Sequence, residues 1–355
     1  MSIRQAILLM GVLLGCVPPE SPTQPGPIAP VRPYRVGFAN IPPSDDFALA
    51  VRSVETWARR ADAAIIHDEP PWTELLAGQS PTRVAEQKYD GVVNYWRQRG
   101  LELVILVDPS NGVDRASDSD NLRRAGRSLT EPAVQQLYRA WVRALVTRYR
   151  PVAIGLAAET NLIRLAAPAT LYAALVRATN DAAGDVRAID SRIPRFVSLQ
   201  VDAAWGRLQG TTTFIGAEQD FRDFPFAEWV GLSSYPYLAN FDEPSQLPND
   251  WYTRVLGGRA LPTIITEGGW TSANVATLRS SPEKQARWIT RQQQLVEPLR
   301  PRCLFQLVFS DLTARTFGND PRLLPFLRLG LVDTLLAPKP ALAAWDSLFA
   351  RRFQP

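Results

Sequence analysis

The chain has 355 residues, with 39 Lys and Arg against 35 Asp and Glu, a single His and two Cys. Its 21% of charged and 46% of hydrophobic residues exclude disorder over most of the length. The basic residues are scattered, so we expect no nucleic-acid partner. Two Cys exclude a disulfide framework, and one His argues against a Ser-His-Asp triad or a multi-His metal site. Any catalysis is therefore expected to depend on carboxylates, with no metal and no cofactor.

The first 33 residues have the pattern of a signal and a tether. Residues 1–15 carry Arg4 and then an apolar run over 6–14 that is too short to cross a bilayer, which is typical of a signal peptide. Residues 13–16, Leu-Leu-Gly-Cys, resemble the bacterial lipobox, and this resemblance implies that Cys16 is lipidated. Residues 16–33 hold seven Pro, which favour extended chain. We expect a lipid-anchored, extracytoplasmic protein of the bacterial cell envelope. An ordinary signal peptide with a chance Cys is the alternative.

Eight short apolar runs follow, and their starts lie 28 to 50 residues apart. They are rich in Val, Ile, Leu and Phe and mostly lack alternation, which is typical of parallel strands buried on both faces. The predicted strands cover 35–40, 63–67, 102–108, 152–158, 195–201, 229–234, 262–267 and 303–310.

Helical patterns occupy the segments between these runs. The clearest helix is predicted to start after Thr130 as its N-cap, with Pro132 in the first turn. Other helices are predicted over 46–60, 83–99, 167–181 and 282–296. Eight β-then-α units over 34–355 predict an α/β fold, a single-domain (β/α)8 TIM barrel that we expect to be a monomer. A doubly wound open sheet is the rival, but the Gly-rich phosphate turn that it often carries after the first strand is missing.

Polar and aromatic residues gather at the C-terminal end of nearly every predicted strand, which is where barrels of this kind place their active sites. In chain order they are Asn40, His67, Asp68, Glu69, Trp72, Asp108, Asn111, Glu159, Asn161, Asp202, Trp205, Tyr235, Tyr237, Glu267, Trp270 and Asp311.

Two of these residues are carboxylates that directly follow apolar strands. Glu159 ends the fourth strand and Glu267 ends the seventh, so each is expected to project into a partly dry cleft. Cleavage of a glycosidic bond needs such a pair, because one carboxylic acid protonates the leaving oxygen while the other, ionised, attacks the anomeric carbon or positions water. Taken singly, either Glu is as well explained as a loop-capping or salt-bridging residue.

Four segments resemble glycoside hydrolase clan A, whose members are retaining (β/α)8 enzymes. They are IGLAAETN (154–161), GLSSYPYL (231–238), ITEGGW (265–270) and GLVDTLLAPKPALAAW (330–345). The strand-six and strand-seven segments are most similar to the endo-β-1,4-galactanase type, family 53. The resemblance implies that Glu159 is the general acid/base, that Glu267 is the nucleophile and that Tyr235 hydrogen-bonds the nucleophile. It also implies retention of the anomeric configuration, with the two carboxyl groups about 5–5.5 Å apart. In place of the clan's usual Asn before the acid/base, this chain has Ala158.

The other strand-end residues have two interpretations each. Trp72, Trp205 and Trp270 either line a sugar site, where Trp faces stack on sugar rings, or pack in the core, whereas Tyr237 is expected to bind substrate. His67 and Asp108 either bind substrate hydroxyls or serve the fold, and Asp311 is expected to cap a helix. Asn161 is expected to bind substrate in place of the clan's Asn. His67-Asp68-Glu69 is too contiguous for a metal site.

Two functions remain open at this point. The first is a retaining glycosidase that acts on an extracytoplasmic poly- or oligosaccharide. The second is a surface lipoprotein that binds glycans on the same barrel without turnover, which Ala158 favours. Retention of both Glu159 and Glu267 favours the enzyme, because a binding protein has no need of both. A metal-dependent esterase or deacetylase is disfavoured by the scarcity of His.

Overall fold

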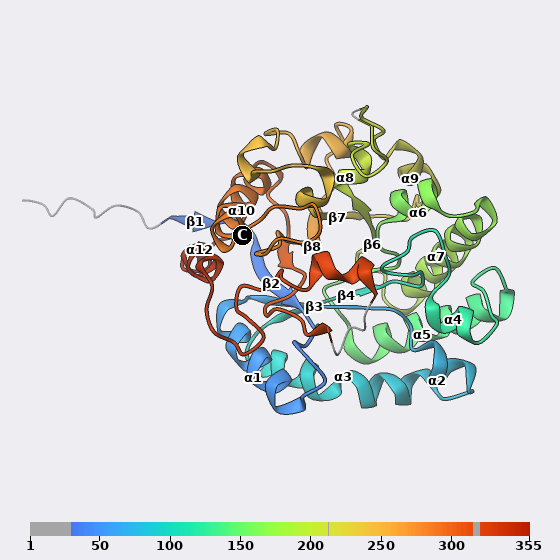
Figure 1. The fold of residues 1–355 in the computed structure, drawn as a ribbon. Coiled ribbons are helices and arrows are strands. Elements are labelled where there is room, and N and C mark those ends of the chain that lie inside the picture. The colour runs from blue at the N-terminus through green and yellow to red at the C-terminus, as the bar shows by residue number, and fades with distance from the viewer. Residues whose placement is uncertain (1–29, 212, 315–319) are drawn as a thin grey trace, which may run out of the picture. The chain divides into compact units, whose positions relative to one another are not determined.

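Eight parallel strands close into a barrel in which each strand is hydrogen-bonded to its neighbours in chain order (Figure 1). They are β2 (Arg35–Ala39), β3 (Ala63–Asp68), β4 (Glu102–Val107), β5 (Ala153–Gly155), β6 (Arg195–Gln200), β7 (Trp229–Ser234), β8 (Thr263–Gly268) and β9 (Cys303–Gln306). This structure, a computed structural model, describes residues 30–211, 213–314 and 320–355. The predicted (β/α)8 barrel is confirmed, and each predicted strand overlaps a barrel strand. The signal peptide and Cys16 lie outside the described residues.

Helices surround the barrel and cover its outer face (Figure 1). The main ones are α1 (Phe47–Trp57), α3 (Pro81–Gln98), α5 (Pro132–Tyr149), α7 (Ala169–Ile189), α10 (Pro282–Val296) and α12 (Pro340–Phe349). Shorter helices follow strand ends: α2 (Trp72–Leu76), α4 (Asp120–Arg124), α6 (Thr160–Ala166), α8 (Val201–Ala204) and α9 (Glu218–Asp223). No helix in the described ranges is long and apolar enough to cross a membrane.

Several expected boundaries were wrong. Helix α7 ends at Ile189 rather than at residue 181, and strands β5 and β9 end at Gly155 and Gln306 rather than at residues 158 and 310. The N-cap of α5 is Glu131 rather than Thr130, and Pro132 stands at the first helical position. The folded body begins at Val31 rather than at residue 34. Strand β1 (Val31–Arg32) pairs with β10 (Arg352–Phe353), and the buried Arg32 guanidinium lies 2.6 Å from an Asp62 carboxylate oxygen. This buried charge pair fixes residues that the proline content assigned to the tether.

Large and small side chains alternate across strands to fill the barrel interior. Its buried cluster includes Phe196 of β6 and Phe305 of β9. Two glycines permit this packing: a Cβ on Gly155 would lie 2.6 Å from the Phe196 ring, and one on Gly37 would lie 1.9 Å from the Ala63 carbonyl oxygen and 3.0 Å from the Phe305 ring. A barrel of eight strands has space for side chains but no pore, so these contacts form a packed core under the site.

Replacing Gly155 by Ala is expected to destabilise the fold by about 3 kcal/mol, because the new methyl overlaps both Phe196 and Leu106, at 2.6 and 2.4 Å. Urea unfolding of the variant and the wild type measures this difference. Gly184→Ala, on helix α7, is the matched control, since a methyl group added there would meet no atom of another element within 4 Å. Equal losses in both variants would contradict the packing argument.

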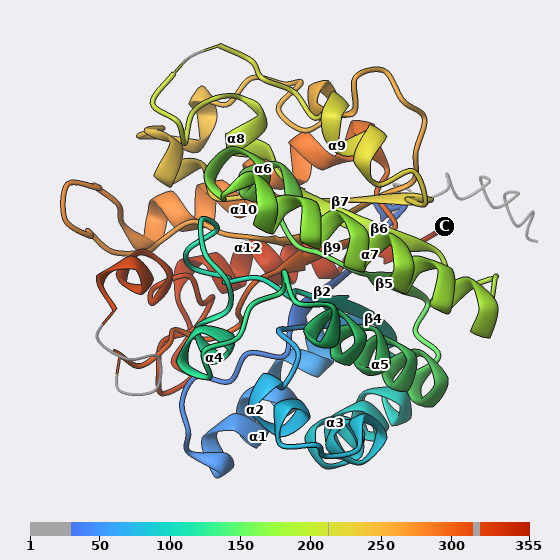
Figure 2. The ribbon, with the colours of Figure 1, turned by 90° about the vertical axis from the view of Figure 1, so that its right-hand side faces the viewer.

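The C-terminal ends of the strands point toward the viewer in Figure 1 and toward the left in Figure 2, where the long loops gather. The loops after β4, β6, β7, β8 and β9 all lie on this face. The chain's C-terminus lies on the opposite face, beside β1 (Figure 2).

Candidate active site

Glu159 stands at a strained turn at the C-terminal end of β5. Its backbone is left-handed, with φ 50° and ψ 45°, and it serves as N-cap of α6. This conformation costs a non-glycine residue about 1–2 kcal/mol, and such strain concentrates at functional sites. The Glu159 N–H donates to Ser198 Oγ of β6 at 2.9 Å, which fixes the turn.

Both carboxylate oxygens of Glu159 have buried donors. Ser233 Oγ of β7 donates to Oε1 at 2.6 Å, and Arg115 Nε donates to Oε2 at 3.0 Å. Burial raises the pKa of Glu159 above its ordinary value, Arg115 opposes this increase, and the charge of Glu267 adds to it. The effect of Glu267 places the two carboxylates within electrostatic reach of each other. A carboxyl group with a raised pKa has the property that a general acid needs.

Glu267 reaches the same end of the barrel from β8. Successive side chains of a strand point to opposite faces, and Ile264 faces the barrel interior. In a regular strand Glu267, three residues later, would therefore point outward. The pairing of β7 with β8 shifts between Leu232 and Ser233, so that Ser233 pairs with Glu267. Such irregularities redirect side chains next to active sites. Glu267 is only 5% exposed.

The hydrogen bond expected between Tyr235 and Glu267 is present: Tyr235 Oη donates to Glu267 Oε2 at 2.7 Å. Burial raises the pKa of Tyr235 well above its ordinary value, and the charges of Glu267 and Glu159 raise it further, so the phenol stays protonated. Glu267 Oε1 is buried and has no hydrogen-bond partner among the described residues. One oxygen of this carboxylate is therefore held and the other is left free.

Arg115 is the site residue that the sequence analysis missed. It lies in the loop between β4 and α4, and its guanidinium is buried between Glu159 and Asp108, whose Oδ2 is 2.5 Å from Nη1. Burial alone would lower the pKa of Arg115, but the carboxylates of Asp108, Glu159 and Glu267 outweigh it and raise the pKa. One Arg among 36, in a loop with no motif, gives no signal in the sequence.

Asp202 supports the nucleophile side from the end of β6. Its Oδ2 accepts a hydrogen bond from the Tyr235 N–H at 2.9 Å, whereas its Oδ1 is buried without a partner among the described residues. Burial raises the pKa of Asp202 to about 6. Asp202 therefore holds the backbone of Tyr235, and the free energy that its burial costs the fold depends on pH.

Replacing Asp202 by Asn is expected to stabilise the protein at neutral pH. Because the folded-state pKa is raised, the wild type loses stability as pH rises from about 4 through about 6, and the loss amounts to about 3 kcal/mol. The Asn variant escapes this loss and still accepts the Tyr235 N–H. Urea unfolding of both proteins at pH 4, 5, 6 and 7.5 should show a difference that grows with pH and levels off above 7. A difference independent of pH would contradict it.

The three strand-end Trp residues are placed in packing contacts. Trp72 is fully buried, and Trp270 is 1% exposed, packed on Trp288 with its Nε1 donating to Ser280. Trp205 stacks on Trp251, with ring centroids 5.1 Å apart, and its Nε1 donates to the Trp251 carbonyl. Trp270 also packs on Tyr237, with ring centroids 5.9 Å apart, and Tyr237 in turn packs on Tyr235.

Other predicted residues divide between the site and the fold. His67 lies beside the nucleophile, with Nδ1 4.0 Å from Glu267 Oε2 and no hydrogen-bond partner in the part of the chain that the structure describes. Asp108 holds Arg115. Asn161 is committed to the fold, because its amide donates to the Gln200 carbonyl and accepts the Gln200 N–H. Tyr237 donates to the Pro325 carbonyl at 3.2 Å.

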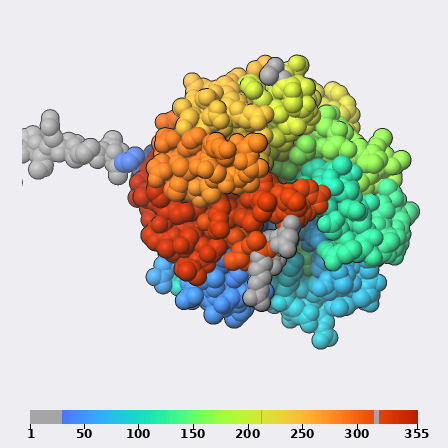
Figure 3. Space-filling view, viewed as in Figure 1, coloured from blue at the N-terminus to red at the C-terminus, as the bar shows by residue number. Residues whose placement is uncertain are grey.

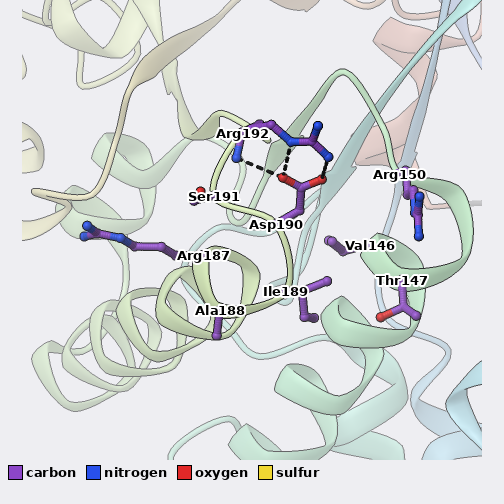
Figure 4. Close-up of a pocket in the computed structure, with 9 residues that line it drawn as sticks. All are labelled: Val146, Thr147, Arg150, Arg187, Ala188, Ile189, Asp190, Ser191 and Arg192. Carbon is purple, nitrogen blue, oxygen red and sulfur yellow. Dashed lines mark hydrogen bonds and ion pairs between the residues drawn. The ribbon is translucent and has the colours of Figure 1, made fainter.

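Pockets occur on both faces of the barrel. On the C-terminal face, a pocket of about 490 Å³ lies beside Glu69 and Trp72, and one of about 290 Å³ lies beside Tyr237 and Ser280. Figure 4 shows a pocket of about 410 Å³ at the ends of α5 and α7, on the opposite face, where Arg192 is paired with Asp190. That face of a barrel serves stability rather than chemistry. Among the residues described, no group of three or more His, Cys, Asp or Glu side chains could hold a metal ion.

Solved structures of glycoside hydrolases share this fold. The exo-β-1,4-mannosidase of Opitutaceae bacterium strain TAV5 superposes with a TM-score of 0.62 and 13% identity over 91% of this chain and 60% of its own. Xylanase 10B of Thermotoga maritima superposes with a TM-score of 0.62 and 12% identity, over 90% of this chain and 95% of its own. A Streptomyces cattleya GH5_18 protein, solved with Manβ1-4GlcNAc, superposes with a TM-score of 0.59 and 16% identity, over 90% of this chain and 80% of its own. No protein-family model and no curated protein matches the sequence. At these identities the likeness shows the fold.

Proposed function

We propose that this protein is a retaining glycoside hydrolase that cleaves a poly- or oligosaccharide with Glu159 as general acid/base and Glu267 as nucleophile. The observation that carries the proposal is the pair itself: two buried carboxylates at the ends of β5 and β8, in different environments. Burial and the neighbouring charge of Glu267 raise the pKa of Glu159, whereas Glu267 accepts the Tyr235 hydroxyl. Environments that separate two carboxyl groups in this way assign the acid and the nucleophile.

The first step breaks the glycosidic bond. The free Oε1 of Glu267 attacks the anomeric carbon while the bond to the leaving oxygen breaks, and Glu159 gives its proton to that oxygen. The Tyr235 hydroxyl holds Oε2, which keeps Oε1 pointing at the substrate. The product of this step is a glycosyl ester of Glu267.

The second step restores the enzyme. Glu159, now ionised, takes a proton from water as the water oxygen attacks the anomeric carbon, and the Glu267 carboxylate leaves. Arg115, in contact with Glu159 Oε2, stabilises the ionised form that exists between the two steps. Two inversions give net retention of the anomeric configuration.

A panel of 4-nitrophenyl β-D-glycosides tests the proposal. The full chain is expected to release nitrophenol from at least one of the glucoside, galactoside, mannoside and xyloside, and proton NMR is expected to show the β-anomer of the free sugar first. First appearance of the α-anomer would overturn the retaining mechanism. The clan resemblance favours a family 53-like specificity, for which the galactoside is the matching substrate.

Glycan binding without turnover is the second candidate function. It is favoured by the ion pair that Arg115 makes with Glu159, which opposes protonation of the acid, and by Ala158 in the position of the clan's Asn. Calorimetric binding of oligosaccharides with no reducing sugar released over days would establish this function in place of hydrolysis.

We also propose that the chain is anchored to the bacterial envelope through a lipid on Cys16, on the basis of the lipobox-like sequence. Labelling of cells with a radioactive or alkynyl fatty acid is expected to mark the wild type but not Cys16→Ser. Equal labelling of both proteins would contradict the anchor.

A further inference from the structure

A short segment lies across the mouth of the barrel on the face that carries the carboxylates. It consists of residues 320–327 and contains the 3-10 helix η6 (Pro321–Phe326). We name it the strap. In Figure 1 it is the red helix that crosses the centre of the barrel, and in Figure 3 the same red segment reaches the cyan-green part of the surface.

One side of the strap rests on the residue that holds the nucleophile. The Phe326 ring meets the Tyr235 ring edge-on, with centroids 5.1 Å apart. The neighbouring Pro325 carbonyl accepts a hydrogen bond from Tyr237 Oη at 3.2 Å. The Leu327 carbonyl accepts a hydrogen bond from the Leu312 N–H at 2.9 Å, which fixes the end of the strap. The strap thus contacts Tyr235, whose hydroxyl donates to Glu267.

The other side of the strap contacts the loop that holds the acid. Arg322 Nη1 lies 3.2 Å from Asp114 Oδ2, and Asp114 directly precedes Arg115, which binds Glu159. The Arg322 and Asp114 side chains are 47% and 33% exposed, so this ion pair adds little stability and mainly shows where the strap ends. The strap therefore spans from the nucleophile side of the site to the acid side.

We propose, on the basis of the proposed function, that the strap closes one end of the sugar site, so that the protein acts on the nonreducing end of a glycan. The sugar that bonds to the nucleophile is the one on the nonreducing side of the cleaved bond. The strap packs on Tyr235, the partner of that nucleophile, and in this proposal it blocks the path by which the glycan would continue past this sugar. The site then accepts a terminal sugar and releases it singly.

The first experiment follows products from oligosaccharides. The panel of 4-nitrophenyl monoglycosides identifies the sugar, and the full chain is then given the matching β-linked hexasaccharide, labelled at its reducing end. The expected first products are a monosaccharide and a labelled pentasaccharide. A hexasaccharide whose terminal nonreducing sugar carries a bulky acetal is expected to react about 100-fold more slowly, because its terminal sugar is displaced. Labelled fragments of two to four sugars at the earliest times would overturn the inference.

A weakened strap provides the second test. In the double variant Arg322→Ala, Phe326→Ala, the rate on the blocked hexasaccharide relative to the monoglycoside is expected to rise about 10-fold. The matched control is Arg287→Ala, which removes an exposed ion pair with Glu243 on the outside of the barrel and is expected to leave both rates unchanged. The same ratio in the double variant and the control would contradict a role for the strap.

Failure of the two proposals can be told apart. Cleavage of a monoglycoside together with internal cleavage of the hexasaccharide overturns the strap inference alone. Binding without turnover overturns the hydrolase, and calorimetry then tests the strap: binding of the free but not the blocked hexasaccharide supports it, and equal binding overturns it. Neither hydrolysis nor binding across the panel overturns both.

Discussion

Replacing Glu267 by Ala is expected to lower kcat on the reactive 4-nitrophenyl glycoside by about 10,000-fold or more, because the covalent step loses its nucleophile. The Tyr235 hydroxyl loses its acceptor in the variant, but the surrounding packing of Tyr235 on Phe326 remains. Initial rates of nitrophenol release measure the effect, and circular dichroism shows whether the barrel is folded.

Azide separates the roles of the two carboxylates. In Glu267→Ala, azide attacks the anomeric carbon once in place of the missing carboxylate, so the expected product is a glycosyl azide of inverted configuration. In Glu159→Ala, Glu267 still forms the ester and azide displaces it, so the expected product keeps its configuration. Glu159→Gln is expected to lower the rate of hydrolysis by about 100- to 10,000-fold on substrates with poor leaving groups. The opposite stereochemistry in the two variants would exchange the assigned roles, and full activity in either would overturn the mechanism.

The barrel was predictable because its pattern is repeated eight times. The run over 152–158 is apolar throughout, which is typical of strands buried on both faces. The predicted ends of helices and the predicted start of the folded body were less accurate, because these boundaries depend on single contacts. The burial of Arg32 against Asp62 is such a contact, since a tether rich in Pro gives no sign that one of its charges will be buried.

The carboxylate pair was predictable from position, but its surroundings were not. Glu159 and Glu267 stand directly at strand ends, where a barrel fixes the location of side chains. The irregular pairing of β7 with β8, which turns Glu267 inward, leaves no mark in the sequence. The roles of aromatic residues at strand ends were ambiguous, because they depend on partners that are distant in the sequence. Trp205 lies at the expected place, but Trp251, 46 residues later, stacks on it, and the Trp251 carbonyl accepts its indole N–H.

Replacing Arg115 by Met is expected to destabilise the fold by about 3–5 kcal/mol, because it leaves Asp108 and Glu159 buried without their counter-charge. Urea unfolding measures the loss. Arg127→Met is the matched control, because Arg127 pairs with Glu131 on the surface, and its unfolding midpoint is expected to stay near that of the wild type. The double variant Asp108→Leu, Arg115→Met is expected to lose less than the sum of its single changes, since no charge at position 108 remains to be buried alone. Additive losses would contradict the charge-pair explanation.

The same residue also controls the protonation of the acid, and this separates a positioning role from a structural one. Arg115 lowers the pKa of Glu159 against the effect of burial, so its removal should raise that pKa further. Because Glu159 must be protonated to act as an acid, activity falls as pH rises through its pKa. The basic limb of the kcat/KM profile is therefore expected to move to higher pH in Arg115→Met. Arg115→Lys keeps the charge, and its basic limb should stay near the wild-type position even if the rate falls. An unchanged limb in the Met variant would show that Arg115 serves the fold alone.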